Sequence, residues 1–227
     1  MTRAILFDTE TTGLEPHLGH RVIEVAALEL MNDLPTGRHF HALIHPERDI
    51  PEDATRIHGI TLAHLTDKPR FAEIVDEMLA FFDEGHLIAH NAPFDFGFLN
   101  AELERLGRPA LMAERMIDTL VLAKTRFPGM PNSLDALCRR FAIDLSARTT
   151  HNAMLDCKLL AEVYVELTGG RQRGLSLVTA TGSGAPVASY SHAGTRSPRP
   201  IMPTAEELAA HATFLARLKE PLWQMTG

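Results

Sequence analysis

The stretch Ala4-Ile5-Leu6-Phe7-Asp8-Thr9-Glu10 dominates the fold prediction, because an apolar run leads directly into two carboxylates one residue apart. Four consecutive apolar residues predict a buried strand. Side chains alternate along a strand, so Asp8 and Glu10 point to the same face at the edge of a core. An unpaired buried carboxylate is unfavourable, and two of them together require a compensating cation. The pattern therefore predicts a metal site.

The chain has 227 residues, which is enough for one well-buried domain and an appendage. Its 45% hydrophobic and 22% charged content is that of an ordinary globular protein. The net charge is −7, and the acidic excess lies within residues 1–170. This acidity argues against binding nucleic acid through a broad cationic surface. If the substrate is a nucleic acid, bound ions and a partner that holds the strand must supply much of the affinity.

Cysteine content and segment lengths also predict the cellular compartment of the protein. Its two cysteines, Cys138 and Cys157, lack metal-ligand spacing and are too few for a disulfide framework, as expected in a reducing cytosol. The first predicted strand begins close to Met1, which leaves no room for a signal peptide, and no apolar run is long enough to span a bilayer. We therefore expect a cytoplasmic protein without a membrane segment.

Hydrophobic patterning predicts an α/β domain with a mixed sheet. Three successive strands are expected, the first ending at Asp8, the second at residues 21–30 and the third at 38–45, with Pro35-Thr36-Gly37 as the turn before the third. Strands and helices then alternate: helix 71–83, strand 86–90, a helix from Pro93 through Leu103 to Gly107, strand 116–120, and helices 133–141 and 152–167. His39, His41 and His45 share a face of the third strand, but exposed polar positions explain them better than a zinc site.

The composition changes after Gly170. Residues 178–200 are rich in Ser, Thr, Gly, Ala and Pro and contain no acidic residue, which is typical of a flexible linker. Thr204-Ala205-Glu206-Glu207 then forms a capping-box pattern at the start of an amphipathic helix. A helix beyond a linker has no core of its own, so it must dock on the body or on a partner, and we favour a partner.

Two further segments contribute residues to the acidic site. Asp95 follows the end of a predicted strand, in the first turn of a helix. His151 and Asp156 are five residues apart and cannot share a helical face, so we expect His151 on the loop before the helix and Asp156 inside the helix, facing the sheet. Taken singly, each has an ordinary structural explanation, but four carboxylates together can hold two divalent metal ions for phosphodiester hydrolysis. A neutral histidine beside them can accept a proton from water.

These segments resemble the three sequence motifs of the DEDDh family of 3′–5′ exonucleases. The first motif is Phe7-Asp8-Thr9-Glu10-Thr11-Thr12-Gly13-Leu14, the second is His90-Asn91-Ala92-Pro93-Phe94-Asp95, and the third is His151 with Asp156. The resemblance covers nearly all of residues 1–170 and is strongest to the members that proofread for bacterial replicative DNA polymerases. It implies an RNase H-like fold, which is a five-stranded mixed sheet flanked by helices.

The resemblance also implies roles for individual residues. Asp8, Glu10, Asp95 and Asp156 would bind two Mg²⁺ or Mn²⁺ ions, and His151 would be the general base. The residues expected to contact the 3′ end of single-stranded DNA are Glu10, Thr11, Asp53, His58, Asn91, Phe94 and Asp156. For Asp53 and His58, local hydrogen bonding of a loop is an equally good explanation. The product would be a 5′-mononucleotide.

The segments after the body resemble binding elements of the same proofreading members. The resemblance implies an exonuclease domain at 1–170, a linker at 171–200 and a polymerase-binding segment at 201–227. Residues 172–177 resemble a sliding-clamp peptide, and residues 205–223 resemble the helix that binds the polymerase III alpha subunit. The expected contacts are Gln172, Leu175 and Leu177 with the clamp, and Leu208, Leu215 and Trp223 with the polymerase. A tethered body needs little affinity for DNA of its own, which would explain its acidity.

Two alternatives remain open at the level of sequence. One is an RNA-directed exonuclease of the same fold, like RNase T or oligoribonuclease, because the catalytic residues do not separate DNA from RNA substrates. The linker and terminal helix count against it. The other is a non-catalytic subunit that braces a polymerase, and the presence of all four acids and His151 counts against that.

Overall fold

The computed structural model of the chain describes residues 2–148, 150–169 and 202–217. These residues belong to two units, with residues 2–169 in the first and 202–217 in the second. The strands of the first unit are β1 Arg3–Thr11, β2 Val22–Met31, β3 Leu34–Leu43, β4 His86–Ala89 and β5 Met116–Asp118. Its helices are α1 Glu52–His58, α2 Leu62–Leu65, α3 Phe71–Phe82, α4 Ala92–Arg105, α5 Thr119–Arg126, α6 Leu134–Arg140 and α7 Ala153–Leu167, with short 3₁₀ turns at Pro16–Leu18 and Ala113–Arg115.

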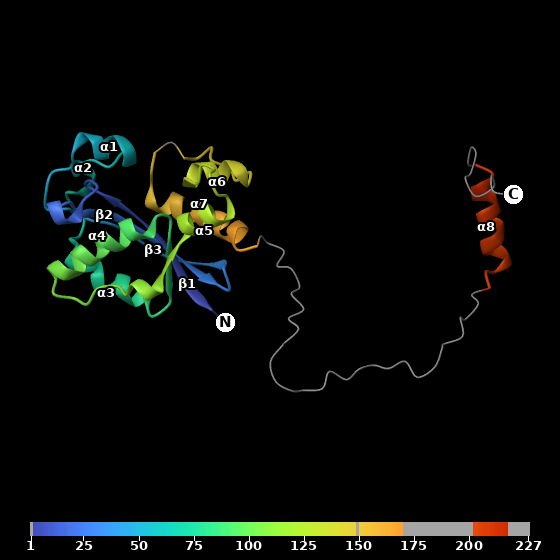
Figure 1. Ribbon diagram of the computed structural model, residues 1–227, viewed down its shortest axis with the longest axis horizontal. Helices are drawn as coiled ribbons and strands as arrows, with labels where there is room; N and C mark the ends of the chain where they lie inside the picture. The colour runs from blue at the N-terminus through green and yellow to red at the C-terminus, as the bar shows by residue number, and fades with distance from the viewer. Residues whose placement is uncertain (1, 149, 170–201, 218–227) are drawn as a thin grey trace, which may run out of the picture. The chain divides into compact units, whose positions relative to one another are not determined.

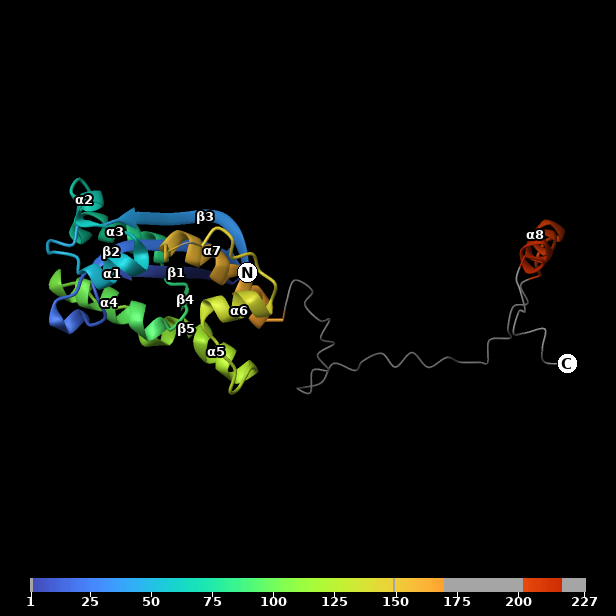
Figure 2. The same ribbon diagram turned by 90° about the horizontal axis from the view of Figure 1, so that it is seen from above.

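The strands form one mixed sheet flanked by helices (Figure 1), and their order is β3-β2-β1-β4-β5 (Figure 2). β1 is antiparallel to β2 and parallel to β4, and β4 is parallel to β5. The first three strands therefore form a meander, and the last two are reached through helical connections. This confirms the predicted α/β class and the five-stranded mixed sheet flanked by helices.

The central strand β1 contributes to two separate cores. Ile5 and Phe7 pack into the core formed with α3 and α4, whereas Ala4 and Leu6 pack into the core formed with α6 and α7. The alternation continues to the end of the strand, so Asp8 and Glu10 point to the α7 side and Thr9 points to the α4 side. The two faces of β1 therefore contact α4, which carries Asp95, and α7, which carries Asp156. In Figure 1, α3 and α4 lie on one side of the strands and α6 and α7 on the other.

Some predicted boundaries are wrong. β1 continues past Asp8 to Thr11, and β5 ends at Asp118 because that residue caps α5 by accepting a hydrogen bond from Leu120 N. The turn between β2 and β3 is Asn32-Asp33, both with positive φ, and not Pro35-Thr36-Gly37, which lies within β3. A two-residue turn with positive φ matches the twist of a hairpin. The helices predicted at 71–83, from Pro93, at 133–141 and at 152–167 are confirmed.

Other structural features bear on smaller predictions. His41 Nε2 lies 2.7 Å from Glu24 Oε1, and the described residues include no metal-binding cluster built from His39, His41 and His45. Cys138 and Cys157 are buried free thiols. Among the residues that the structure describes, no helix combines the length and apolar character that crossing a bilayer requires.

The second unit contains α8 Ala205–Leu215, and its start agrees with the predicted capping box. Thr204 Oγ1 accepts a hydrogen bond from Glu207 N (3.2 Å), and Glu207 accepts one from Thr204 N (2.7 Å). Leu208 is 54% exposed on this helix, and Leu215, its last residue, is partly exposed. Gln172, Leu175, Leu177 and Trp223 lie outside the described residues.

Candidate active site

All ten residues predicted for the catalytic centre and the DNA 3′ end line one cleft of about 1010 Å³. The cleft lies where β1, α1, α4 and α7 meet, with Leu134 and Asp135 of α6 on its wall. The predicted residues that line it are Asp8, Glu10, Thr11, Asp53, His58, Asn91, Phe94, Asp95, His151 and Asp156. Four segments far apart in sequence thus converge at one place: the three that carry the four acids and His151, and α1, which carries Asp53 and His58.

Asp8 and Glu10 form the floor of the cleft on β1. Burial, reinforced by the negative charges of Asp95 and Glu10, raises the pKa of Asp8 well above its usual range. Burial and the nearby Glu24 raise the pKa of Glu10 to about 8. Both shifts arise because the charged form of each carboxylate is poorly solvated and faces other carboxylates.

Asp95 is held in place by β1. Its Oδ1 accepts hydrogen bonds from Thr9 N (3.1 Å) and Thr9 Oγ1 (2.6 Å), and the residue is only 3% exposed. Asn91, in the left-handed conformation with φ 64°, turns the chain from β4 into α4 and sets the first helical turn beside β1. Burial raises the pKa of Asp95 to about 7, although the hydrogen bonds from Thr9 oppose the rise.

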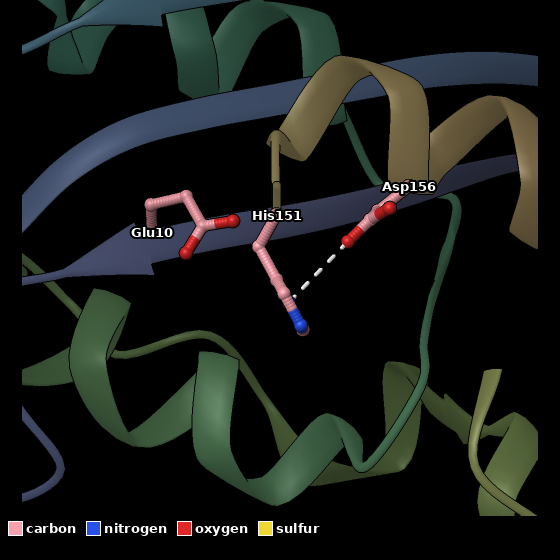
Figure 3. Close-up of side chains that lie close together, drawn as sticks. All are labelled: Glu10, His151 and Asp156. Atoms are coloured by element: carbon pink, nitrogen blue, oxygen red, sulfur yellow. Dashed lines mark ion pairs between the residues drawn. The ribbon is translucent and has the colours of Figure 1, made fainter. Parts of the chain in front are cut away.

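The side chains of His151 and Asp156 lie close together at the start of α7 (Figure 3). Asp156 is inside the helix and buried, whereas His151 is exposed on the preceding loop. The distance from His151 Nδ1 to Asp156 Oδ2 is 3.6 Å. His151 N donates a hydrogen bond to Ile57 O (3.1 Å), which attaches the loop to α1. Ligand atoms of Glu10, His151 and Asp156 all lie within 4.8 Å of one another, and Asp8 and Asp95 are not part of that tight group.

Arg148 is a residue of the site that the sequence did not identify. Its guanidinium donates to both oxygens of Asp156, from Nε to Oδ1 (2.6 Å) and from Nη2 to Oδ2 (2.7 Å). Nη1 donates to Asp135 Oδ1 (2.6 Å). The sequence does not indicate that this arginine binds Asp156 and Asp135, because these contacts depend on how its loop folds over α6 and α7.

Glu24 was also missed, although a carboxylate inside the apolar run of β2 was a usable signal. It pairs with Glu10 across the β1–β2 ladder and is fully buried. Its carboxylate accepts hydrogen bonds from Ala153 N (3.3 Å) and Asn152 Nδ2 (3.3 Å), so it fixes the first turn of α7 to the sheet. Glu24 therefore positions the helix that carries Asp156.

The residues predicted to contact substrate differ in exposure and in the partners that their side chains already have. Thr11 Oγ1 donates to Gly13 O (2.6 Å), and Phe94 packs on Phe98 with ring centroids 4.9 Å apart. His58 is 5% exposed; its Nδ1 accepts from Ile60 N (3.0 Å), and its Nε2 has no hydrogen-bond partner among the described residues. Asp53 is exposed on α1 and forms an ion pair with Arg56. His58 thus lines the cleft with a buried ring that faces the Thr11 backbone, whereas Asp53 faces mainly solvent.

The donor set fits Mg²⁺ or Mn²⁺, because hard divalent ions prefer carboxylate oxygens. Within residues 2–148 and 150–169, Asp8, Glu10 and Asp95 form no ion pair with a lysine, arginine or histidine. Uncompensated carboxylates at this depth are unfavourable unless a cation joins them. Burial, with repulsion between the carboxylates, raises the pKa values of these groups, and bound divalent ions would compensate their negative charges.

The raised pKa values predict a pH dependence of stability in the absence of metal. A carboxyl group whose pKa is higher in the folded chain binds its proton more tightly there, so stability is greatest below the unfolded-state pKa and is lost as pH rises through the folded-state value. For Asp95 and Glu10 those values are about 7 and about 8. In EDTA, the melting temperature should therefore fall as pH increases from about 5 to about 8.

Circular dichroism melts at several pH values, with and without Mn²⁺, measure this effect. Mn²⁺ should remove most of the fall, because it compensates the ionised carboxylates. A melting temperature in EDTA that is constant or rises over this range would show that these carboxylates are not strained by burial and mutual repulsion.

Comparisons with known proteins agree with this geometry. A family model described as an exonuclease, RNase_T, matches residues 5–164. This chain belongs to that exonuclease family. The match extends from β1 through most of α7, so it includes every acid of the cleft and His151. The chain is therefore a 3′–5′ exonuclease.

Individual relatives extend the comparison beyond the exonuclease body. The DNA polymerase III subunit epsilon of Rickettsia felis is 48% identical over 221 residues, which cover 95% of this chain and 96% of the relative. Among solved structures, exonuclease X in complex with 5′ overhanging duplex DNA is 25% identical, with a TM-score of 0.58 over 73% of this chain and 90% of the other. The nuclease domain of 3′hExo, a DEDDh family member bound to rAMP, has a TM-score of 0.62 at 18% identity, over 75% of this chain and 94% of the other, and shows the shared fold.

Proposed function

We propose that this exonuclease proofreads for the replicative DNA polymerase by removing nucleotides from the 3′ end of a single strand. Asp8, Glu10, Asp95 and Asp156 would hold two divalent metal ions, Mg²⁺ or Mn²⁺. Such ions, when bound, stabilise charge on the attacking and leaving oxygens of a phosphodiester. The observation that carries the proposal is the convergence of four acids and His151 from three separate segments in one cleft.

His151 is the general base of the proposed mechanism. It is exposed at the cleft and carried by a loop that is attached to α1, so its ring can reach water without being buried. Neutral imidazole accepts the proton of the attacking water, and the new bond to phosphorus forms as the bond to the 3′ oxygen breaks. The 3′ oxygen leaves with the electron pair of the broken bond and takes up a proton from solvent, so the shortened strand ends in a 3′ hydroxyl and the product is a 5′-mononucleotide.

The terminal nucleotide would occupy the part of the cleft beside α1 and α4. Phe94 offers an aromatic ring for stacking, and Thr11 and Asn91 offer polar groups near the sugar. His58 Nε2 is a buried atom without a partner among the described residues, so it would donate a hydrogen bond to the substrate. Asp53 is the weakest member of this set, because its carboxylate already pairs with Arg56.

Digestion of matched single-stranded DNA and RNA by the purified full-length chain tests the proposal. With Mg²⁺ or Mn²⁺, 5′-labelled DNA should shorten stepwise from its 3′ end and release mononucleotides, and DNA should be degraded faster than RNA. Faster degradation of RNA would favour the RNA-directed alternative. No degradation of either would favour a subunit that only braces the polymerase.

We also propose that residues 171–200 are a linker and that residues 201–227 bind the polymerase III alpha subunit, with residues 172–177 binding the sliding clamp. Two observations support a role in partner binding for the segment after the exonuclease domain. The 48% identical relative aligns over 95% of this chain, well past the exonuclease model that ends at residue 164. The capped helix α8 also presents exposed Leu208 and Phe214.

Deletion of residues 201–227 should separate binding from hydrolysis. The truncated chain is expected to hydrolyse free single strands within about twofold of the full-length rate, because the cleft is built entirely from residues before 170. It should no longer co-elute with the polymerase subunit in size-exclusion chromatography. Co-elution of the truncated chain would show that the tail is not the binding segment.

A further inference from the structure

Arg148 occupies a special position at the acidic cleft. Its guanidinium forms a fork on Asp156, with contacts of 2.6 and 2.7 Å, and reaches Asp135 with its third nitrogen at 2.6 Å. Nη2 also lies 3.2 Å from His151 Nδ1. The side chain is only 10% exposed. A two-bond contact between arginine and a carboxylate is among the strongest polar contacts in proteins.

Arg148 is also the arginine whose charge acts on the rest of the acidic cluster. Its guanidinium contacts Asp156, Asp135 and His151, which places its positive charge within the acidic group. Within residues 2–148 and 150–169, it is the only lysine or arginine paired with an acid of the predicted metal set. The metal-free site is therefore partly neutralised by one side chain.

The same contacts place Arg148 in competition with a metal ion. Both oxygens of Asp156 already accept hydrogen bonds from the guanidinium. A divalent ion on that carboxylate would lie next to a fixed positive charge, and like charges at short range in a partly buried cleft repel strongly. Asp135 gives Arg148 a second partner just outside the acidic set, on the first turn of α6.

We propose that Arg148 is an internal counter-cation, which holds Asp156 in the metal-free chain and leaves it when divalent ions bind, while Asp135 keeps the guanidinium nearby. The inference rests on the proposed function, since it takes Asp156 to be a metal ligand. Arg148 is thus a positioning residue that makes metal binding weaker than the four acids alone would make it. A purely structural arginine would have the opposite effect, because its loss would disorder Asp156 and weaken metal binding.

The test measures Mn²⁺ binding to the full-length chain by titration calorimetry in the absence of nucleic acid. Arg148→Met keeps much of the apolar stem and removes the charge, and Arg148→Lys keeps the charge but loses the fork. Asp135→Asn removes the second partner. Arg108→Met is the control for loss of a surface arginine, because Arg108 forms an exposed ion pair with Asp76 (2.7 Å) and does not line the cleft.

Arg148→Met should bind Mn²⁺ about tenfold more tightly than the wild type, and its melting temperature in EDTA should be lower, because the acids lose their counter-charge. The Mn²⁺ affinity of Arg148→Lys should lie between those of Arg148→Met and the wild type. Asp135→Asn should bind Mn²⁺ more weakly than the wild type, because Arg148 would have no second carboxylate partner once it moved away from Asp156. Arg108→Met should match the wild type in Mn²⁺ affinity.

Unchanged or weaker Mn²⁺ binding by both Arg148 variants, beside normal binding by the wild type, would overturn the inference while leaving the proposed function intact. Should Arg148→Met fail to fold, Arg148→Lys decides, and an affinity at or below the wild-type value would count against the inference. If the wild-type chain binds no Mn²⁺, the proposed function fails and the inference fails with it.

Discussion

Replacing Asp8 with asparagine is expected to lower the rate of 3′-end hydrolysis by about a thousandfold or more, because metal ions held by carboxylates contribute several kcal/mol to phosphodiester hydrolysis. The same substitution should raise the melting temperature in EDTA. Asp8 is a strained acid without metal, since burial together with Asp95 and Glu10 raises its pKa well above the usual range. Asparagine has nearly the same shape and no charge, so the repulsion disappears.

Opposite changes in activity and metal-free stability are the signature of a metal-binding acid. Stopped-flow or gel assays with 5′-labelled single-stranded DNA give the rate, and circular dichroism in EDTA gives the melting temperature. Asp76→Asn is the matched control, because Asp76 is an exposed aspartate outside the cleft. A rate within tenfold of the wild type would contradict the role of Asp8, whereas loss of both rate and metal-free stability would mean that the substitution merely damages the fold.

His151→Ala is expected to lower the rate by about 10²- to 10⁴-fold, the usual contribution of a general base. A general base acts only in its unprotonated form, so the wild-type rate should rise with pH where chemistry limits the reaction, and His151→Ala should lose that rise. Since the ring is exposed on a loop, the substitution should leave the melting temperature nearly unchanged.

Metal binding separates two roles for His151, whose ring nitrogen lies in a tight group with Glu10 and Asp156. A general base can be removed without changing Mn²⁺ affinity, whereas removal of a metal ligand weakens it. We therefore expect His151→Ala and the wild type to bind Mn²⁺ equally. A parallel loss of affinity and rate, or a pH profile identical to that of the wild type, would contradict the role of base.

Local periodicity explains how much of the site the sequence predicts. Asp8 and Glu10 share a face because strand side chains alternate, and Ala4 and Leu6 of the same face indeed pack against α7. The five-residue spacing of His151 and Asp156 likewise requires one on the loop and one in the helix. Such rules depend only on neighbours in sequence, so they could be applied without a structure.

The features that the sequence missed depend on contacts between distant segments. Glu24 fixes the start of α7 across 129 residues, and the fork of Arg148 on Asp156 exists because a loop folds back over α6 and α7. The β2–β3 boundary was wrong because turn composition alone did not show which residues adopt positive φ. Asn32 and Asp33 both adopt positive φ and make the β2–β3 turn, although Pro35-Thr36-Gly37 has the more usual turn composition.

We propose that four carboxylates from β1, α4 and α7 together hold two divalent ions. The number of Mn²⁺ ions bound per chain at saturation, measured on the wild type and on Asp8→Asn, tests this most directly. We expect two ions in the wild type, with loss of at least one in Asp8→Asn. No binding by the wild type, or two ions bound with unchanged affinity by the variant, would contradict it.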